Sequence, residues 1–399
     1  MRFREFQLPE RYHNALLQWQ RRNFPDLQIL LDYWDKYFPG EPPFNLTAKI
    51  APLKDTAIEV GTFRGRPKLM RAAEMRGNML YTAVRIVKAQ CSTELGSIQQ
   101  HLETLDGTVS DRTKFSILRI CAEELRHAYQ MFWVLSQDTS WPEAGVTDIA
   151  NQTMDELLAM TTGSHVLDAF NIPFHDPLDN MMFSFLIDRV GKYQLSMQQV
   201  FAYAPMAQSM APMLHEESFH LRTGYELVRE VAVLAASGSG RWTLEEIQRR
   251  MNWWFPRGAE MFGSPEGGQS NIAFGFKDRL NGESFQAYSA EVGRLLRRIN
   301  LAVLQTRDPS LSREVLEERV ESEPGPFELP HASFFRMRGS QDIALQPVDI
   351  KGNRVSAEEH RQHLQQVLPQ QALTTEFLDK YLAAFMTATN EQSRTGMNA

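Results

Sequence analysis

Two short stretches of this sequence pair a carboxylate with an imidazole at a spacing that suits metal binding. They are residues 214–220 (LHEESFH) and residues 122–127 (AEELRH). Each contains Glu-x-x-His, and residues three apart on a helix share a face, so one carboxylate and one imidazole can bind the same ion. The pattern therefore indicates metal coordination by two pairs of residues: Glu124 with His127, and Glu217 with His220.

The motif alone decides little, because the sequence contains it four times. Between Glu328 and His331 lies Pro330, and a proline there argues against a helix interior. The pair Glu10 and His13 follows a proline near the N-terminus and has no acidic residue on an upstream helix. Both of these pairs are interpreted as ordinary surface residues.

An upstream acid distinguishes the two central pairs. Glu94 lies thirty residues before Glu124, and Asp188 lies twenty-nine residues before Glu217. Two antiparallel helix pairs, each with one acid on its first helix and Glu-x-x-His on its second, form the di-metal carboxylate site of a four-helix bundle. The sequence thus predicts an all-α, ferritin-like bundle with six metal ligands: Glu94, Glu124, His127, Asp188, Glu217 and His220.

The apolar faces around these six residues support the same conclusion. An unpaired carboxylate buried in such a face costs several kcal/mol, and four together repel one another, whereas two bound cations offset both costs. Ligands that are mostly carboxylates, with one imidazole per ion, suit iron or manganese, and iron is preferred here. The expected catalytic groups are the four carboxylates and Gln90, one helical turn before Glu94.

Helical periodicity predicts the elements that position these ligands. The four bundle helices are expected near residues 67–105, 110–137, 178–203 and 205–236, with a long crossover between the second and third. The predicted domains are an N-terminal arm (1–66), the bundle (67–236), further helices packed on it (237–308) and a C-terminal extension (309–399). A hairpin at 334–348 and a helix at 374–387 are predicted within the extension.

Composition narrows the classes of function. The 399 residues carry a net charge of −7 and no long run of Lys or Arg, so no nucleic-acid partner is expected. No apolar stretch of roughly 18 residues occurs, which predicts no membrane partner and a cytoplasmic location. Two cysteines, Cys91 and Cys121, are too few for an iron–sulfur site within one chain. Electrons for redox chemistry would therefore come from another protein or cofactor.

The ligand motifs, together with the segment 183–195 (FSFLIDRVGKYQL), resemble a known family. That family is the oxygenase component of benzoyl-CoA epoxidase and its relative, the catalytic subunit of phenylacetyl-CoA epoxidase. The resemblance covers roughly residues 60–300, and the benzoyl-CoA branch is the more similar. The run Asp188-Arg189-x-Gly191-Lys192 is its most specific part, since many ferritin-like proteins share Glu-x-x-His.

This resemblance implies a di-iron monooxygenase that activates O2 and epoxidises the ring of an aromatic acyl-CoA. It implies two iron ions as cofactors and an external NAD(P)H-dependent flavin and iron–sulfur reductase as electron donor. The chain would be a monomer or a homodimer. Two alternatives stay open, namely a non-catalytic ferritin-like scaffold or acyl-CoA-binding subunit and an oxygenase for a substrate that is not a CoA thioester. A ferroxidase or iron store is a third possibility.

Candidate substrate residues come from two places in the chain. The densest basic stretch offers cations for the CoA phosphates, and the apolar side chains near the ligands are candidate pocket walls. Equally, the basic residues can be solvated surface, and the Met and Phe side chains can be ordinary core. The candidates are Arg64, Arg66, Lys68, Phe185, Met210 and Met213.

Overall fold

The structure is a computed structural model that describes residues 3–138, 140–144, 148–322, 325–337, 346–374, 378 and 381. Its contacts divide the chain into two compact units, each assembled from segments far apart in the sequence. The first unit comprises Met1–Asn180, Gly191–Leu221 and Gly268–Leu280; the second comprises Met181–Val190, Arg222–Gly267 and Asn281–Ala399. The contiguous domain ranges expected from the sequence remain a prediction.

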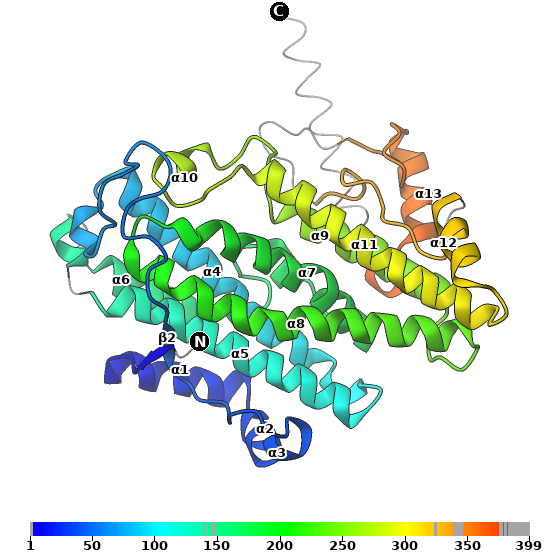
Figure 1. Cartoon of the computed structure of the whole chain (residues 1–399), viewed down its shortest axis with the longest axis horizontal. Coiled ribbons are helices and arrows are strands. Elements are labelled where there is room, and N and C mark those ends of the chain that lie inside the picture. The colour runs from blue at the N-terminus through cyan, green and yellow to red at the C-terminus, as the bar shows by residue number, and fades with distance from the viewer. Residues whose placement is uncertain are drawn as a thin grey trace, which may run out of the picture. The chain divides into compact units, whose positions relative to one another are not determined.

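Helices dominate the described residues, and the predicted all-α class is confirmed. The first unit contains a set of short elements and the long helices α4 and α5 (Figure 1). Its elements are β1 (Arg4–Phe6), α1 (Glu10–Asn23), α2 (Leu27–Asp32), α3 (Trp34–Tyr37), β2 (Ala48–Ile50), α4 (Asn78–Glu103), α5 (Asp111–Ser136), α6 (Ile149–Ala159) and α10 (Gln269–Ala273). Two long helices, α7 (Pro177–Met197) and α8 (Ala204–Ala236), contribute residues to both units.

The second unit is also helical. Besides its parts of α7 and α8, it contains α9 (Leu244–Glu260), α11 (Asn281–Arg307), α12 (Arg313–Ser322) and α13 (Ala357–Val367). Helix α9 begins with a capping box, in which Thr243 and Glu246 each bond the other's backbone N–H, so the helix start is fixed by its own sequence. The predicted helix at 374–387 and most of the predicted hairpin at 334–348 lie outside the described residues.

Helices α5 and α7 begin at recognisable caps. Ser110 caps α5 by accepting a hydrogen bond from the backbone N–H of Thr113 at 3.1 Å. Helix α7 begins with a capping box between Asp176 and Asp179, and Pro177 occupies its first position, where a missing N–H costs nothing. These signals place both helices within a residue or two of their predicted starts.

The first bundle helix starts later than predicted. Residues 67–77 were expected to be helical, but Leu69 forms a bridge with Tyr203, and α4 begins only at Asn78. Gly77 has a φ of +56°, a conformation outside the helical range that glycine adopts without steric cost. Within this stretch only Ala72–Glu74 forms a helical turn, a short 3-10 helix, and its neighbours Leu69 and Met75 are not part of α4.

Helix α5 forms the centre of the first unit. Every residue from Ile117 to Leu135 is buried, and α4 lies alongside it (Figure 1). The strands β1 and β2 pair antiparallel, with Glu5 opposite Lys49, and β2 contacts α5. Since α5 buries ionisable side chains as well as apolar ones, those charges require partners within the protein.

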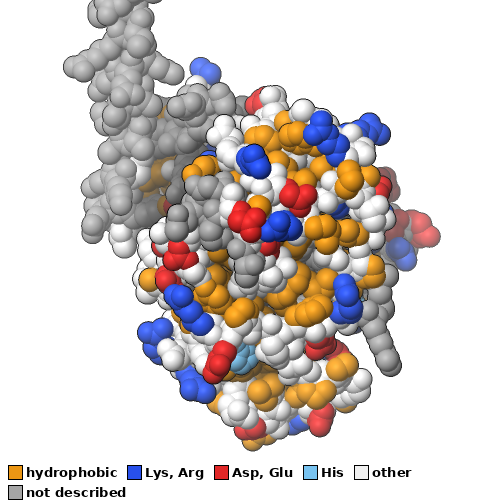
Figure 2. Space-filling view, turned by 90° about the vertical axis from the view of Figure 1, so that its left-hand side faces the viewer, with side chains coloured by type: hydrophobic (Ala, Val, Ile, Leu, Met, Phe, Trp, Pro, Cys, Tyr) orange, Lys and Arg blue, Asp and Glu red, His pale blue; other side chains and the backbone are white. Residues whose placement is uncertain are grey.

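The surface carries charges of both signs. On the face shown in Figure 2, basic and acidic side chains are interspersed with hydrophobic ones. Among the described helices, none combines the length and the apolar character needed to cross a membrane.

Candidate metal centre

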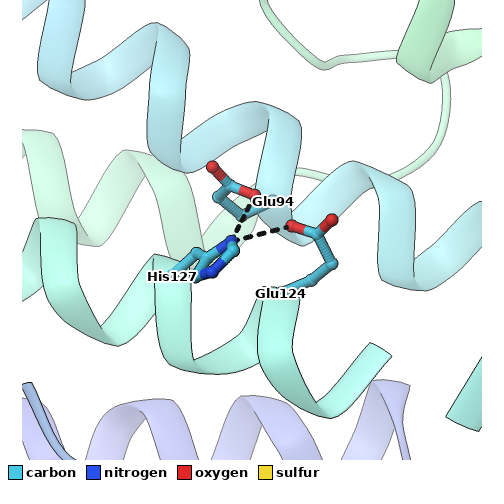
Figure 3. Close-up of side chains that lie close together, drawn as sticks. All are labelled: Glu94, Glu124 and His127. Atoms are coloured by element: carbon cyan, nitrogen blue, oxygen red, sulfur yellow. Dashed lines mark ion pairs between the residues drawn. The ribbon is translucent and has the colours of Figure 1, made fainter. Parts of the chain in front are cut away.

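Five of the six predicted ligands lie in the first unit, and the structure brings them together. Two groups of three have potential ligand atoms within 4.8 Å of one another: Glu94, Glu124 and His127 form the first, and Glu124, Glu217 and His220 form the second. Each of the five side chains is at most 5% exposed. Figure 3 shows the first group, with α4 contributing Glu94 and α5 contributing the other two.

Glu124 and Glu217 face both imidazoles. Nδ1 of His127 lies 3.5 Å from Glu124 and 3.8 Å from Glu217, and Nδ1 of His220 lies 3.3 Å from Glu124 and 3.5 Å from Glu217. Nδ1 of His127 is also 3.6 Å from Glu94. Were two ions bound, Glu124 and Glu217 could hold either one, and Glu94 would hold the ion beside His127.

These distances fit metal ions better than hydrogen bonds. Good N–H···O hydrogen bonds are about 2.7–3.2 Å long, whereas two ligand atoms each about 2.1 Å from one ion are about 3–4 Å apart. Within the part of the chain that the structure describes, Nδ1 of His127, Nδ1 of His220, and one oxygen each of Glu124 and Glu217 have no hydrogen-bond partner. Buried polar atoms normally have partners, so the donor set fits two bound cations.

Burial and neighbouring charges shift the pKa values of four of these side chains. Burial raises the pKa of Glu124 well above its usual range, and the neighbouring charge of Glu94 raises it further. For Glu94, burial acts in the same direction, but the nearby Glu124, His127 and Gln90 side chains outweigh it, so the pKa is lowered. Burial would lower the pKa of His127 and of His220, yet the surrounding carboxylates hold both well above the usual range. Without metal, protons therefore occupy the site.

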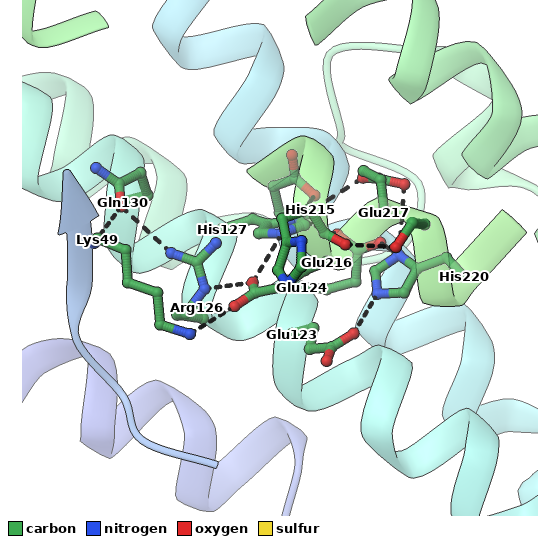
Figure 4. Close-up of polar contacts among 12 residues, drawn as sticks. Lys49, Glu123, Glu124, Arg126, His127, Gln130, His215, Glu216, Glu217 and His220 are labelled. Carbon is green, nitrogen blue, oxygen red and sulfur yellow. Dashed lines mark hydrogen bonds and ion pairs between the residues drawn. The ribbon is translucent and has the colours of Figure 1, made fainter. Parts of the chain in front are cut away.

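A second layer of carboxylates, Glu123 and Glu216, holds the other nitrogen of each imidazole (Figure 4). Nε2 of His220 is hydrogen-bonded to Glu123 at 3.0 Å, and Nε2 of His127 lies 3.2 Å from Glu216. The contacts cross between helices, since Glu123 is on α5 with His127 and Glu216 is on α8 with His220. Such contacts fix the ring orientation and leave Nδ1 directed at the inner carboxylates.

Cations compensate the charge of these two outer carboxylates. Arg126 and Lys49 both pair with Glu216, the latter at 2.7 Å, and Arg119 pairs with Glu123 at 3.0 Å. Burial would raise the pKa of Glu216, but these cations and His127 lower it strongly, so this carboxylate is ionised. The sequence reasoning assigned no role to Glu123 or Glu216. The doubled Glu in both Glu-Glu-x-x-His motifs was the signal available for them.

Gln90 contacts one of the five ligands, whereas Asp188 lies in the other unit. Gln90 donates a hydrogen bond from Nε2 to Glu94, and its catalytic role remains a prediction. Asp188 is buried on α7 and belongs to the second unit, so its place as the sixth ligand also remains a prediction. Cys91 and Cys121 are fully buried, which agrees with small core residues.

The candidate substrate-binding residues differ in their exposure. Arg64 and Arg66 are exposed, but Lys68 is not part of an exposed patch: its ammonium is buried and donates to the carbonyl oxygens of Val200 and Phe201 at 2.8 and 3.2 Å. Lys68 therefore corrects the expectation of one continuous surface patch, because its charge is satisfied internally. The candidate wall residues Phe185, Met210 and Met213 are fully buried, and their contact with substrate remains a prediction.

A helical protein in which two Glu-x-x-His pairs face one another across buried carboxylates is of the ferritin-like di-metal class. Comparison with known proteins agrees. The family model described as "Phenylacetic acid catabolic protein" matches residues 117–311. The chain is also 31% identical over 155 residues to "Benzoyl-CoA oxygenase component B" of Aromatoleum evansii, a match that covers 38% of this chain and 31% of the relative.

Both matches confirm the resemblance found in the sequence, and the chain is related to these proteins. The region that matches the family model begins in α5, just before Glu124 and His127, and extends past the end of α11. It therefore includes five of the six predicted ligands, all except Glu94. The match spans about a third of the relative's length.

Proposed function

We propose that this chain is a di-iron oxygenase that inserts one atom of O2 into the aromatic ring of an acyl-CoA thioester, most similar to benzoyl-CoA, to give an epoxide. The observation that carries the proposal is the buried set of carboxylates shared between two imidazoles, with Nδ1 of both rings directed at it. Support for the class of substrate comes from the relative, whose name is that of a benzoyl-CoA oxygenase component. A carboxylate-rich, thiolate-free ligand set suits iron.

In this proposal Glu94, Glu124, Asp188 and Glu217 are the carboxylate ligands, and His127 and His220 are the imidazole ligands. Asp188 is assigned by its spacing before Glu217, which repeats the spacing of Glu94 before Glu124. When bound, the two irons supply the binding and reduction of O2. The chain's own residues hold the ions, and the buried surroundings exclude water.

The reaction balances as follows. O2, two electrons and two protons are consumed, one oxygen atom is added across a ring double bond, and the other leaves as water. A separate NAD(P)H-dependent flavin and iron–sulfur reductase supplies the electrons. Glu123 and Glu216 keep Nδ1 of the two imidazoles directed inward while the charge of the site changes, because each is fixed by its own cation.

The direct test of the activity uses a panel of aromatic acyl-CoA thioesters and the corresponding free acids, with a reductase, NADPH and ¹⁸O2. We expect one ¹⁸O atom in the product of an acyl-CoA and none without O2. Products from free acids but from no thioester would refute the choice of substrate. An Asp188→Ala variant that turns over like the wild type would refute the assignment of Asp188.

A non-catalytic, acyl-CoA-binding subunit of the same fold is the second candidate. It would not require competent ligands, whereas the five positions described above all carry side chains able to bind iron. In the same assay such a subunit would bind the thioester without consuming O2.

A further inference from the structure

The two outer carboxylates are linked to the N-terminal segment before α4. The ammonium of Lys49, in β2, lies 2.7 Å from Glu216. Eight residues earlier, Glu41 lies 2.6 Å from Arg119, the cation that holds Glu123. One short stretch of chain, residues 41–49, thus places a charge beside each half of the metal centre.

These two charges have opposite sign. Beside His127, the carboxylate of Glu216 meets two cations, Lys49 and the fully buried Arg126, which leaves an excess of one positive charge. Beside His220, Arg119 lies between two carboxylates, those of Glu123 and Glu41, which leaves an excess of one negative charge. The outer charge therefore differs by two units between the two halves of the site.

The low solvent exposure of Arg126 and Arg119 limits the screening of this charge difference. The side chains of Arg126 and Arg119 are 0% and 11% exposed, and the guanidinium of Arg119 lies 3.9 Å from the ring centre of Phe219 and 4.8 Å from that of Phe38. Charges held among apolar rings are screened less than charges in water. Lys49 and Glu41 are 25% and 48% exposed, so their effect is weaker than that of a fully buried charge.

The inner ligands do not cancel the difference. Glu124 and Glu217 each face both imidazoles at 3.3–3.8 Å and so favour neither position. Glu94 faces His127, and the proposed function assigns Asp188 as the sixth ligand. The inference rests on that proposed six-ligand site.

We propose that the N-terminal segment makes the two metal positions unequal, so that the position beside His220 binds a divalent cation first and more tightly, and the position beside His127 fills second. Excess positive charge opposes a cation, and excess negative charge favours it. Lys49 and Glu41 act through Glu216 and Arg119 and do not touch the ions, so they are positioning residues.

Anaerobic titration of the metal-free protein with Co(II), followed by the visible absorption of the bound ion, tests the proposal. We expect two equivalents with separate affinities in the wild type. In Lys49→Met the second equivalent binds about fivefold more tightly and the first is unchanged. In Glu41→Gln the first equivalent binds about fivefold more weakly and the second is unchanged. A merely structural effect would weaken both equivalents in both variants.

Matched controls are Lys114→Met and Glu143→Gln, since these side chains are similarly exposed (29% and 59%) and pair with Asp106 and Arg71 away from the ligands. Neither control should change either affinity. The proposal is overturned if Lys49→Met and Glu41→Gln move the same equivalent, or if neither differs from its control. Fewer than two equivalents in the wild type would overturn the proposed site and this inference together.

Discussion

Replacing Glu216 by Gln removes one negative charge from the buried cluster around Arg126 and His127. In the wild type Arg126, Lys49 and His127 surround this carboxylate, and the guanidinium of Arg126 is fully buried. Glu216→Gln therefore leaves Arg126 as a buried cation without its counter-charge. Breaking a buried pair by removing one partner costs about 3–5 kcal/mol, and we expect that loss in the free energy of unfolding of the metal-free protein.

Removing both partners should cost less than the two single changes together. An Arg126→Met, Glu216→Gln double variant leaves no buried guanidinium without a counter-charge, so we expect a coupling of about 2–3 kcal/mol in the double-mutant cycle. Urea unfolding followed by circular dichroism gives each free energy. Glu321→Gln is the control, because that carboxylate is 64% exposed in its pair with Arg297 and should contribute little.

Two results would refute this reasoning. A Glu216→Gln variant within about 1 kcal/mol of the wild type would show that the buried pair does not hold the site together. Additive single changes would show that Arg126 and Glu216 act independently. In the Glu216→Gln variant, metal affinity should fall about 10–100-fold, as is usual when the partner of a ligating imidazole is lost.

Three further predictions concern the same unit. Adding Co(II) to metal-free protein at pH 7 should release protons, detected with a pH indicator, because the raised pKa values of His127, His220 and Glu124 favour bound protons that the metal displaces. Gly96→Ala should destabilise the fold by about 1–3 kcal/mol, since its Cβ would lie 2.9 Å from a neighbouring side chain, whereas Gly191→Ala, with its nearest contact at 3.5 Å, should be tolerated in thermal unfolding. Burial lowers the pKa of His101 to about 4, below its ordinary 6.5, so the unfolded chain binds the proton more readily than the folded protein does. The free energy of unfolding should therefore decrease as pH falls from 6.5 to 4. His101→Gln should make the free energy of unfolding less dependent on pH over that range.

The ligand set could be predicted from the sequence because it depends on helical spacing. Glu124 with His127 and Glu217 with His220 repeat one motif, and an upstream acid precedes each by nearly the same interval. Local periodicity determines which side chains share a face, and apolar faces determine which side points inward. For Glu94 and the two motifs, that reasoning was sufficient to identify residues that meet in the structure.

The outer carboxylates could not be predicted in this way. Glu216 is four residues from His220 on the same helix, yet its partner is His127 on α5, so the pairing depends on how the helices pack. Lys49 and Glu41 are more distant still, in a segment for which the sequence predicted only an arm. Tertiary packing, and not helix periodicity, determines such contacts.

The predicted start of α4 was wrong for a similar reason, because long-range contacts determine it. Residues 67–77 have the composition of a helix. The backbone N–H of Lys68, however, donates a hydrogen bond to the carbonyl oxygen of Thr56, and that of Leu69 donates to Ala202, so these two residues do not join α4. These long-range bonds outweigh a helix propensity of a few tenths of a kcal/mol per residue. Lys68 is buried as well, which removed it from the expected basic patch.

Iron content is the measurement that tests the central claim most directly. Protein reconstituted anaerobically with Fe(II), freed of excess metal and analysed for iron, should contain two irons per chain, since a ligand set of this type serves two ions. The Glu124→Ala, Glu217→Ala double variant lacks both shared carboxylates and should retain little or none. If that variant folded and bound as much iron as the wild type, the di-iron site described here would be wrong.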